Sequence, residues 1–259
     1  MVAACSSKSP NAKEEKKTGW QLVWADEFDN TGKPDPTKWG YDVGGHGWGN
    51  NELQYYTEGA NAQVGNGVLT IEARHENHEG SSYTSTRLVS KGKGDWTYGR
   101  FEIRAKLPWG RGTWPAIWML PTEWTLGNGS WPDNGEIDIM EHVGYYPGKI
   151  HASIHTNAYN HAQNTQKSGS LSVLTAMSDF NTYTLEWSAD SIKAFVNEHH
   201  YFSTPNENLG WEKWPFYKDF HLILNLAIGG TWGGAQGVDD AIFPQQLVVD
   251  FVRVYEWVE

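Results

Sequence analysis

Cysteine is almost absent from this sequence of 259 residues, which contains only Cys5. A single cysteine excludes an intrachain disulfide. Long apolar runs are also absent, since no stretch reaches the roughly 18 residues that a membrane-spanning helix requires. No segment sustains the period of about 3.6 residues that is typical of an amphipathic helix. These absences exclude a disulfide-held fold and a membrane-spanning segment, and they argue against a helical protein.

Basic residues are scarce as well, with 20 Lys and Arg against 31 Asp and Glu and a formal net charge of −11. Nucleic acids and anionic membrane surfaces both bind to clustered Lys and Arg side chains. The charge balance therefore argues against nucleic acid and anionic membrane surfaces as partners. A neutral polymer is compatible with it.

Aromatic residues, in contrast, are abundant: the sequence has 15 Trp and 12 Tyr, together with 28 Gly. Trp and Tyr present flat apolar faces with a polar edge, which suits the apolar C–H faces of sugar rings. Many of these rings must instead fill the core. The length is sufficient for one large domain with a sizeable core.

The first 18 residues differ in composition from the remainder, because they contain no aromatic residue and carry a Lys-Glu-Glu-Lys-Lys cluster. We predict a flexible linker over 1–18 and one folded domain over 19–259. The small residues before Cys5 resemble the end of a bacterial lipoprotein signal, although the basic and long apolar regions of a signal peptide are missing. This predicts an extracellular or cell-surface protein, lipid-anchored through Cys5; the alternative is an incidental cysteine in a tail.

From residue 19 onward, apolar and polar residues alternate in short runs separated by Gly, Pro, Asn and Asp. Such alternation predicts β-strands with one buried face. Many short strands without intervening helices predict an all-β sandwich of two antiparallel sheets. A turn or short helix is expected over 172–180. The clearest runs are 69–73, 101–107, 183–187, 222–228 and 248–256.

The stretch 135–144, Gly-Glu-Ile-Asp-Ile-Met-Glu-His-Val-Gly, places three acids in an apolar setting. In a strand, Glu136 and Asp138 share one face, but Glu141 is an odd number of residues away from Glu136. A bulge near residues 139–140 adds one residue and returns Glu141 to that face. A helix would spread the three acids around its axis.

A row of carboxylates on one face is typical of glycoside hydrolysis, which uses two carboxyl groups on either side of the scissile bond. Asp138 lies between Glu136 and Glu141, where its charge and hydrogen bonds can control which of them carries a proton. The alternative is an exposed acidic strand face without catalytic function.

The sequence resembles glycoside hydrolase family 16, and most closely its bacterial laminarinases, which are endo-acting β-1,3-glucanases. The resemblance extends in order over nearly all of 19–259. It implies a concanavalin-like β-jelly-roll with an open concave cleft, and hydrolysis with retention of configuration. The motifs that carry it are Glu-Ile-Asp-Ile-Met-Glu at 136–141, Trp-Ala-Asp-Glu-Phe at 24–28, Asn-Glu-Leu-Gln-Tyr-Tyr at 51–56, Tyr-Gly-Arg-Phe-Glu at 98–102, Trp-Pro-Ala-Ile-Trp-Met-Leu at 114–120, Gly-Gly-Thr-Trp-Gly-Gly at 229–234 and Val-Asp-Phe-Val-Arg-Val-Tyr at 249–255.

By position in these motifs, Glu136 resembles the nucleophile, Glu141 the general acid/base and Asp138 the residue that assists the nucleophile. The resemblance also implies a set of substrate-binding residues: Asn51, Arg87, Trp114, Trp118, His155 and Trp232. For three of these residues, a role without any contact to substrate stays open as the alternative. Trp118 can be a core residue, Arg87 a solvated strand residue and His155 an ordinary hydrogen-bonded histidine.

No cofactor is expected for catalysis, because Ala152 follows His151 and the zinc-protease pattern needs Glu at that position. The resemblance implies a structural calcium ion held by the Glu27 carbonyl, the Gly67 carbonyl and Asp250. Asp250 lies among apolar residues, where its carboxylate needs a partner, and oxygen ligands suit Ca²⁺. A buried hydrogen bond or salt bridge is the alternative.

The sequence therefore predicts a monomeric endo-β-1,3-glucanase acting on laminarin-type β-glucans by double displacement. The alternatives are a hydrolase of mixed-linkage glucan or agarose on the same fold, and a non-catalytic, lectin-like carbohydrate-binding module. Carrageenan ranks low, because a sulfated galactan needs basic residues in the cleft. The choice among glucans is expected to depend on the loops 44–50, 121–133 and 157–169.

Overall fold

The computed structural model describes residues 18–259. The predicted lipid attachment residue Cys5, and the predicted linker apart from Thr18, lie outside the described residues. The first strand begins at Gly19, where the folded domain is predicted to begin.

Within the described part of the chain, the secondary structure is almost entirely β. The strands are β1 (Gly19–Asp26), β2 (Gly40–Asp42), β3 (Gln54–Tyr56), β4 (Ala62–Gly65), β5 (Val68–His78), β6 (Ser81–Ser85), β7 (Arg87–Val89), β8 (Asp95–Trp96), β9 (Gly99–Lys106), β10 (Thr113–Pro121), β11 (Glu136–His142), β12 (Lys149–His155), β13 (Lys167–Ser172), β14 (Asn181–Trp187), β15 (Ser191–Val196), β16 (His199–Pro205), β17 (Phe220–Ile228) and β18 (Gln245–Val258). Two 3₁₀ turns, η1 (His161–Gln163) and η2 (Asp240–Ile242), interrupt the loops.

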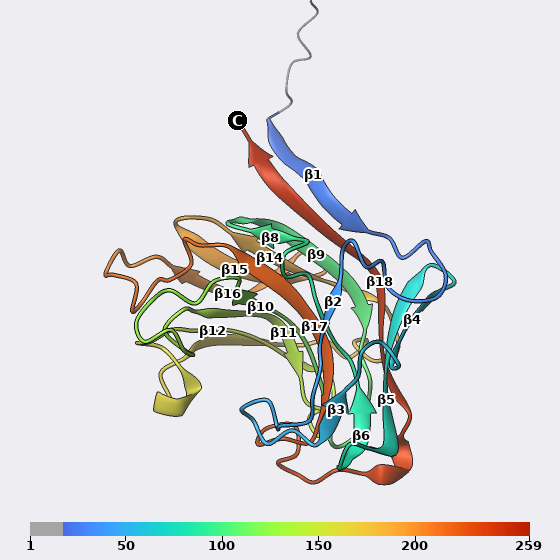
Figure 1. The fold of residues 1–259 in the computed structure, drawn as a ribbon. Coiled ribbons are helices and arrows are strands. Elements are labelled where there is room, and N and C mark those ends of the chain that lie inside the picture. Colours follow the sequence, from blue (N-terminus) through green and yellow to red (C-terminus); the bar gives the residue numbers. More distant parts are fainter. Residues whose placement is uncertain (1–17) are drawn as a thin grey trace, which may run out of the picture.

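The strands form two curved sheets packed face to face, which confirms the predicted sandwich (Figure 1). The outer sheet has ten strands in the order β16-β15-β14-β9-β18-β5-β6-β3, with β1 added beside β18 and β4 beside β5. The inner sheet has eight, in the order β13-β12-β11-β10-β17-β7-β2, with β8 added beside β17. The pairing is antiparallel except between β3 and β6, which run parallel.

Alternation along the strands builds the core between the sheets. In β9, Phe101 and Ile103 are completely buried, while Arg100 and Glu102 lie partly exposed on the outer face. Each large apolar side chain buried in this way contributes about 1.5–3 kcal/mol relative to an exposed one. The predicted runs are therefore strands because each has one face that packs into this core.

Segments outside the sheets agree with the absence of helical periodicity. A turn or short helix was predicted over 172–180; Ser172 ends β13, and the residues after it form turns and not a helix. None of the helical segments in residues 18–259 is long and apolar enough to cross a membrane. In Figure 1, β1 and the end of β18 extend as a two-stranded ribbon beyond the sandwich.

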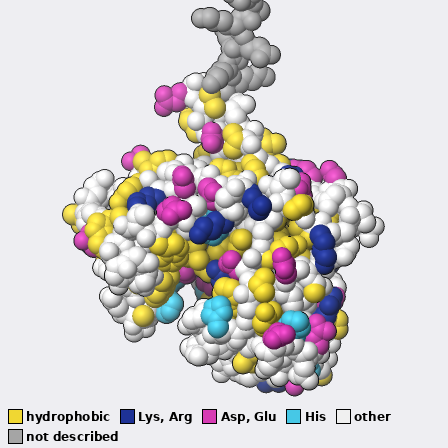
Figure 2. All heavy atoms as spheres, viewed as in Figure 1, with side chains coloured by type: hydrophobic (Ala, Val, Ile, Leu, Met, Phe, Trp, Pro, Cys, Tyr) yellow, Lys and Arg dark blue, Asp and Glu magenta, His cyan; other side chains and the backbone are white. Residues whose placement is uncertain are grey.

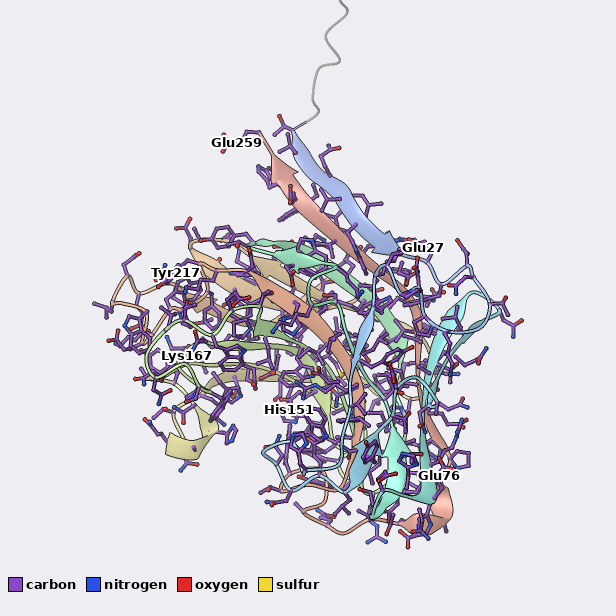
Figure 3. All side chains as sticks on the ribbon, viewed as in Figure 1. Glu27, Glu76, His151, Lys167, Tyr217 and Glu259 are labelled. Atoms are coloured by element: carbon purple, nitrogen blue, oxygen red, sulfur yellow. The ribbon has the colours of Figure 1, made fainter. Side chains whose placement is uncertain are left out.

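The second face of the inner sheet borders a hollow in the molecular surface. Figure 2 shows this hollow between two lobes, with histidine side chains at its edges. In Figure 1, the loop containing η1 and the loop between β2 and β3 stand on its two sides. Figure 3 shows His151 on this concave side, whereas Glu27 and Glu76 lie on the outer side. The predicted concave cleft is therefore present on the sheet that contains the acidic stretch.

Candidate active site

The acidic stretch forms β11, near the middle of the inner sheet, and it contains the predicted bulge. In the pairing with β10, Asp138 lies opposite Trp118 and Met140 opposite Ile117, so Ile139 is the extra residue. The pairing with β12 shifts over the same residues. The bulge returns Glu141 to the face occupied by Glu136 and Asp138.

The apolar residues of the stretch explain why the bulge forms. Ile139 and Met140 are consecutive and both completely buried, which a regular strand with alternating side chains does not allow. The bulge frees the Ile139 carbonyl from the ladder, and the Tyr201 hydroxyl of the outer sheet donates to it at 2.8 Å. Burial of the two side chains and satisfaction of this carbonyl both stabilise the irregular strand.

Glu136 lies between an indole and a histidine. The Trp131 Nε1–H donates to Glu136 Oε2 at 3.0 Å, and His155 Nε2 is 3.7 Å from Glu136 Oε1. His155 is also the direct partner of Glu136 in the register between β11 and β12. The predicted substrate-binding histidine therefore lies beside the predicted nucleophile, and not beside the leaving-group acid Glu141.

Asp138 is nearly completely buried and is held by two neighbours on β12. The Ser153 hydroxyl donates to Asp138 Oδ2 at 2.5 Å, and His155 Nε2 lies 3.2 Å from the same oxygen. Burial alone lowers the pKa of His155, but the hydrogen bond to Asp138 and the charge of Glu136 raise it to about 9. His155 is therefore a cation at neutral pH, directly beside Glu136 and Asp138.

Among residues 18–259, the direct neighbours of the Glu141 carboxyl group are uncharged. The Trp114 Nε1–H donates to Glu141 Oε1 at 3.0 Å. His151, its partner in the β12 register, has a pKa lowered by burial and is neutral at neutral pH. The two glutamates thus share one face but differ in surroundings, since a cation adjoins Glu136 and a neutral imidazole adjoins Glu141.

These surroundings determine where a proton resides. Burial raises the pKa of Glu141 well above its usual range, the charges of Asp138 and Glu136 add to the rise, and the more distant charge of His155 opposes it only in part. Burial and the charge of Asp138 also raise the pKa of Glu136, to about 7, but His155 opposes the rise. Because the cation adjoins Glu136, we place the proton of the pair on Glu141 and the negative charge on Glu136.

Aromatic rings extend the site beyond Glu141. Trp114 meets Trp232 edge to face at 5.6 Å between ring centroids, and Trp232 also contacts His151 at 5.1 Å. Asn51 Nδ2 donates to Thr231 Oγ1 at 3.2 Å, so Asn51 adjoins the loop that carries Trp232. The structure thus brings three predicted substrate-binding residues, Trp114, Trp232 and Asn51, to one region of the cleft.

Trp118 and Arg87 form a second group on the same face. Arg87 is nearly buried, forms an ion pair with Asp42 at 3.0 Å, and lies 4.7 Å from the ring centroid of Trp118. Its guanidinium also lies 4.8 Å from the ring centroid of Trp48. The alternative of a solvated Arg87 is therefore wrong. Trp118 is only partly buried and faces the cleft side of β10, not the core between the sheets.

Several residues that complete the site were not singled out from the sequence. Trp131 and Trp48 lie in loops that were predicted to influence the choice of glucan, and no local pattern shows which Trp approaches an acid. Ser153 and His151 alternate with the apolar residues of β12, which is the one signal that could have placed them on the cleft face. The pair Asn225 and His221 alternates in β17 in the same way.

The metal predictions concern two different places. Glu136, Asp138 and His155 have ligand atoms within 4.8 Å of one another, the one such cluster among the described residues. Their contacts with one another account for the clustering. On the outer sheet, Glu27 follows β1, Gly67 lies in the turn before β5, and Asp250 stands where the pairing of β18 with β9 shifts.

The calcium residues offer two carbonyl groups and one carboxylate, all oxygen donors of the kind Ca²⁺ prefers. The Asp250 carboxylate is about one-third exposed and forms an ion pair with Arg104. The Glu27 side chain pairs with Arg253 at 2.7 Å, which leaves its carbonyl for other contacts. The salt-bridge alternative thus accounts for the Asp250 charge, while the oxygen donors also fit a cation.

A cavity of about 660 Å³ lies elsewhere, between the edge strands β13 and β16. Its lining includes Lys167, Ser168 and Tyr201, but none of the three acids of β11.

Comparison with known proteins places these features in a family. The family model described as "Glycosyl hydrolases family 16" matches residues 49–252. The chain is 61% identical to a beta-glucanase of Rhodothermus marinus over 266 residues, which cover 100% of this chain and 93% of the relative.

Solved structures agree with the sequence match. The laminarinase from Rhodothermus marinus is 61% identical and superimposes with a TM-score of 0.93, covering 94% of this chain and 100% of that one. A mutant of a non-specific endo-beta-1,3(4)-glucanase, co-crystallised with 1,3-beta-D-cellotriosyl-glucose, is 46% identical with a TM-score of 0.88. That superposition covers 92% of this chain and 95% of the other.

Proposed function

The chain belongs to the glycosyl hydrolases of family 16, and from this premise we propose that it is an endo-β-1,3-glucanase that hydrolyses laminarin-type β-glucans with retention of configuration. One observation carries the proposal. The bulge of β11 aligns Glu136, Asp138 and Glu141 on the cleft face, and their neighbours differ in charge. Two carboxyl groups of opposite protonation on one face are what double displacement requires.

In the first step, the ionised Glu136 attacks the anomeric carbon while Glu141 gives its proton to the glycosidic oxygen. The bond between the anomeric carbon and that oxygen breaks, and a covalent glycosyl-enzyme forms on Glu136. The shortened chain leaves with the proton of Glu141. The Trp131 N–H holds one oxygen of Glu136 in place, so the other oxygen is directed to the sugar.

In the second step, the ionised Glu141 accepts a proton from water, and the resulting hydroxide equivalent attacks the anomeric carbon. The ester bond to Glu136 breaks, and the two inversions together give net retention. Glu141 is again protonated and Glu136 again ionised. The cationic His155 and the hydrogen-bonded Asp138 keep the negative charge on Glu136 between turnovers.

The choice of glucan rests on the relatives and on the lining of the cleft. The relatives described above are a beta-glucanase, a laminarinase and a non-specific endo-beta-1,3(4)-glucanase. The last supports activity on mixed-linkage β-1,3-1,4-glucan as a second candidate. Indole rings in the cleft suit the apolar faces of neutral glucose units.

Release of reducing ends from laminarin, lichenan and agarose, followed by NMR of the first product anomer, tests the proposal. We expect rapid cleavage of laminarin, initial β-anomers, and little or no cleavage of agarose. Glu136→Ser and Glu141→Ser should each lower kcat by at least about 1000-fold, because each removes a group that takes part in bond making. Glu256→Ser, at an exposed position on β18, is the matched control.

Near-normal turnover in either active-site variant would contradict the assignment. Binding of laminarin without cleavage by the unaltered protein would favour the lectin-like alternative. Cleavage of lichenan faster than laminarin would assign the mixed-linkage activity.

We also propose that Glu27, Gly67 and Asp250 hold a structural calcium ion on the outer sheet, with no part in the reaction. Its support is the set of oxygen donors after β1, in the turn before β5 and at the pairing shift within β18. The extracellular or cell-surface location, the lipid anchor at Cys5 and the monomeric state stay predictions.

A further inference from the structure

A group of buried polar side chains lies beneath the cleft floor near Trp118, outside the acidic strand. Tyr56 and Gln54 are completely buried, Asn225 is nearly so, and Glu52 is partly buried. Buried polar groups destabilise a fold unless they are hydrogen-bonded. The contacts of these four residues with Trp118 form one connected arrangement, called here the Trp118–Glu52 network.

Starting from Trp118, the donor and the acceptor of each hydrogen bond in the network are fixed. An indole N–H can only donate, and the Trp118 Nε1–H donates to Asn225 Oδ1 at 2.7 Å. The amide orientation of Asn225 is thereby set, and its Nδ2–H donates to Tyr56 Oη at 2.9 Å. The Tyr56 hydroxyl must therefore turn its own hydrogen to Glu52 Oε2, which is 3.1 Å away.

The other end of the network is fixed in the same way. The backbone N–H of Ile228 donates to Gln54 Oε1 at 2.7 Å. The Gln54 amide nitrogen must then face Glu52, and it donates to Glu52 Oε2 at 2.7 Å. Each end of the network begins with a group that can only donate a hydrogen bond: the Trp118 indole N–H at one end and the Ile228 backbone N–H at the other. The residue at which the two ends meet must therefore accept a hydrogen bond from each side. Glu52 supplies such an acceptor.

The network holds the part of the cleft floor where Arg87 and two indoles meet. Arg87 lies against the rings of Trp118 and Trp48, and the Trp48 ring contacts the Tyr56 ring at 5.3 Å. Rotation of the Trp118 indole would leave the buried Asn225 oxygen without its donor. Loss of the acceptor at Glu52 would release Tyr56, and through it Asn225.

We propose that Glu52 is a positioning residue, which fixes the Trp118 indole and the adjoining Arg87 as a sugar-binding surface through Tyr56 and Asn225. This inference rests on the proposed function, since it assigns a role in binding a glucan. Glu52 itself lies beneath the floor and acts through Trp118. Its loss should therefore weaken binding of the sugar while the chemistry at Glu136 and Glu141 is retained.

Four variants test the proposal. Glu52→Leu removes the acceptor, and Tyr56→Phe interrupts the network while keeping the ring packing. Glu52→Gln keeps one oxygen that accepts from Tyr56 and Gln54. Its amide nitrogen replaces the oxygen to which the Asn50 Nδ2–H donates at 3.4 Å, so the Asn50 amide turns its own oxygen to it. Tyr255→Phe is the matched control, because that hydroxyl bonds Glu102 on the outer sheet.

Two readouts are measured on each folded variant. The first is kcat and KM on a defined β-1,3-gluco-oligosaccharide. The second is the ¹⁵N indole resonance of Trp118, assigned by its loss in Trp118→Phe. We expect Glu52→Leu and Tyr56→Phe to shift the resonance and raise KM about tenfold with kcat within about twofold, the size of effect that follows a disrupted buried hydrogen bond.

Glu52→Gln and Tyr255→Phe should leave both readouts as in the unaltered protein. The double variant Glu52→Leu/Tyr56→Phe should be no worse than either single variant, because both interrupt one network. An unmoved Trp118 resonance in Tyr56→Phe, a moved resonance with unchanged KM, or additive losses in the double variant would each overturn the proposal. Failure of the unaltered protein to cleave β-1,3-glucan would instead contradict the proposed function, while the resonance would still report on the network.

Discussion

His155 is the residue that makes the two glutamates unequal. Its imidazole lies 3.2 Å from Asp138 and 3.7 Å from Glu136, and with its pKa raised to about 9 it stays charged across the neutral range. The corresponding neighbour of Glu141 is the neutral His151. Without a cation on one side, burial would drive protons onto both glutamates and leave no nucleophile.

Replacing His155 by Asn should move the acidic limb of the kcat/KM pH profile upward by about one unit. The His155 charge lowers the pKa of Glu136, so its removal raises that pKa above about 7 and leaves less ionised nucleophile at pH 6–7. Kinetics on laminarin between pH 5 and 9 measure the shift. His161→Asn is the control, because burial lowers the pKa of His161 and the ring carries no charge there. An acidic limb that stays in place would show that His155 does not set the charge of Glu136.

Residue types and spacing were sufficient to predict the three acids and their common face, because a bulged strand is a local property. The partners that set their protonation were less accessible. Trp131 and Ser153 approach the acids from a loop and from a neighbouring strand, and these contacts depend on loop shape and strand register. For His155 the residue was predicted but its position was not, since register alone places it beside Glu136.

At the scale of elements, the bulge of β11 depends on a residue from the other sheet. Tyr201 of β16 reaches across the core, and its hydroxyl donates to the Ile139 carbonyl that the bulge removes from the ladder. A buried carbonyl without a donor costs about 1–3 kcal/mol, so this contact favours the bulged over the regular strand. The alignment of Glu141 is thereby linked to the outer sheet.

Tyr201→Phe should destabilise the protein by about 1–3 kcal/mol and lower kcat about tenfold, because the Ile139 carbonyl loses its donor and Glu141 is less firmly held. Urea unfolding and laminarin turnover measure the two effects. Tyr183→Phe is the control: that hydroxyl is buried without a hydrogen-bond partner among the described residues, and its removal should cost little. Equal behaviour of the two variants would argue that Tyr201 contributes packing only.

The longer alternating strands such as β9 were predictable, since one face lies in the core and the alternation of apolar and polar residues records that face. The position of the bulge followed from the odd spacing between Glu136 and Glu141, which a regular strand would place on opposite faces. Its partner Tyr201 did not, because 62 residues separate it from Ile139 and only the packing of the two sheets brings them together. The parallel pairing of β3 with β6 was also not predictable, because a strand of three residues is too short to show a sequence pattern.

At the scale of the whole molecule, the two sheets have different tasks. The inner sheet presents acids, histidines and indoles to the cleft, whereas the outer sheet carries ion pairs such as Arg100 with Glu186 and Arg253 with Glu27. Strand β1 is attached to this outer sheet through β18 alone, so the start of the domain depends on its end. A cation bound jointly by residues of β18, the turn before β5 and the residue after β1 would stabilise the attachment of β1 to the outer sheet.

Calcium should therefore raise the melting temperature without changing the chemistry of the cleft. An ion at about 100 times its dissociation constant adds about 2.7 kcal/mol, which corresponds to roughly 5–10 °C for a domain of this size. Thermal unfolding with Ca²⁺, with Mg²⁺ and with a chelator measures the effect, and laminarin turnover at 25 °C should be equal in all three. Asp250→Asn should abolish the response to Ca²⁺, because the neutral amide keeps an oxygen for Arg104 but loses the charge that a divalent ion needs. If the melting temperature is the same with Ca²⁺ and with chelator, the Arg104–Asp250 ion pair alone accounts for the carboxylate, and the calcium proposal is wrong.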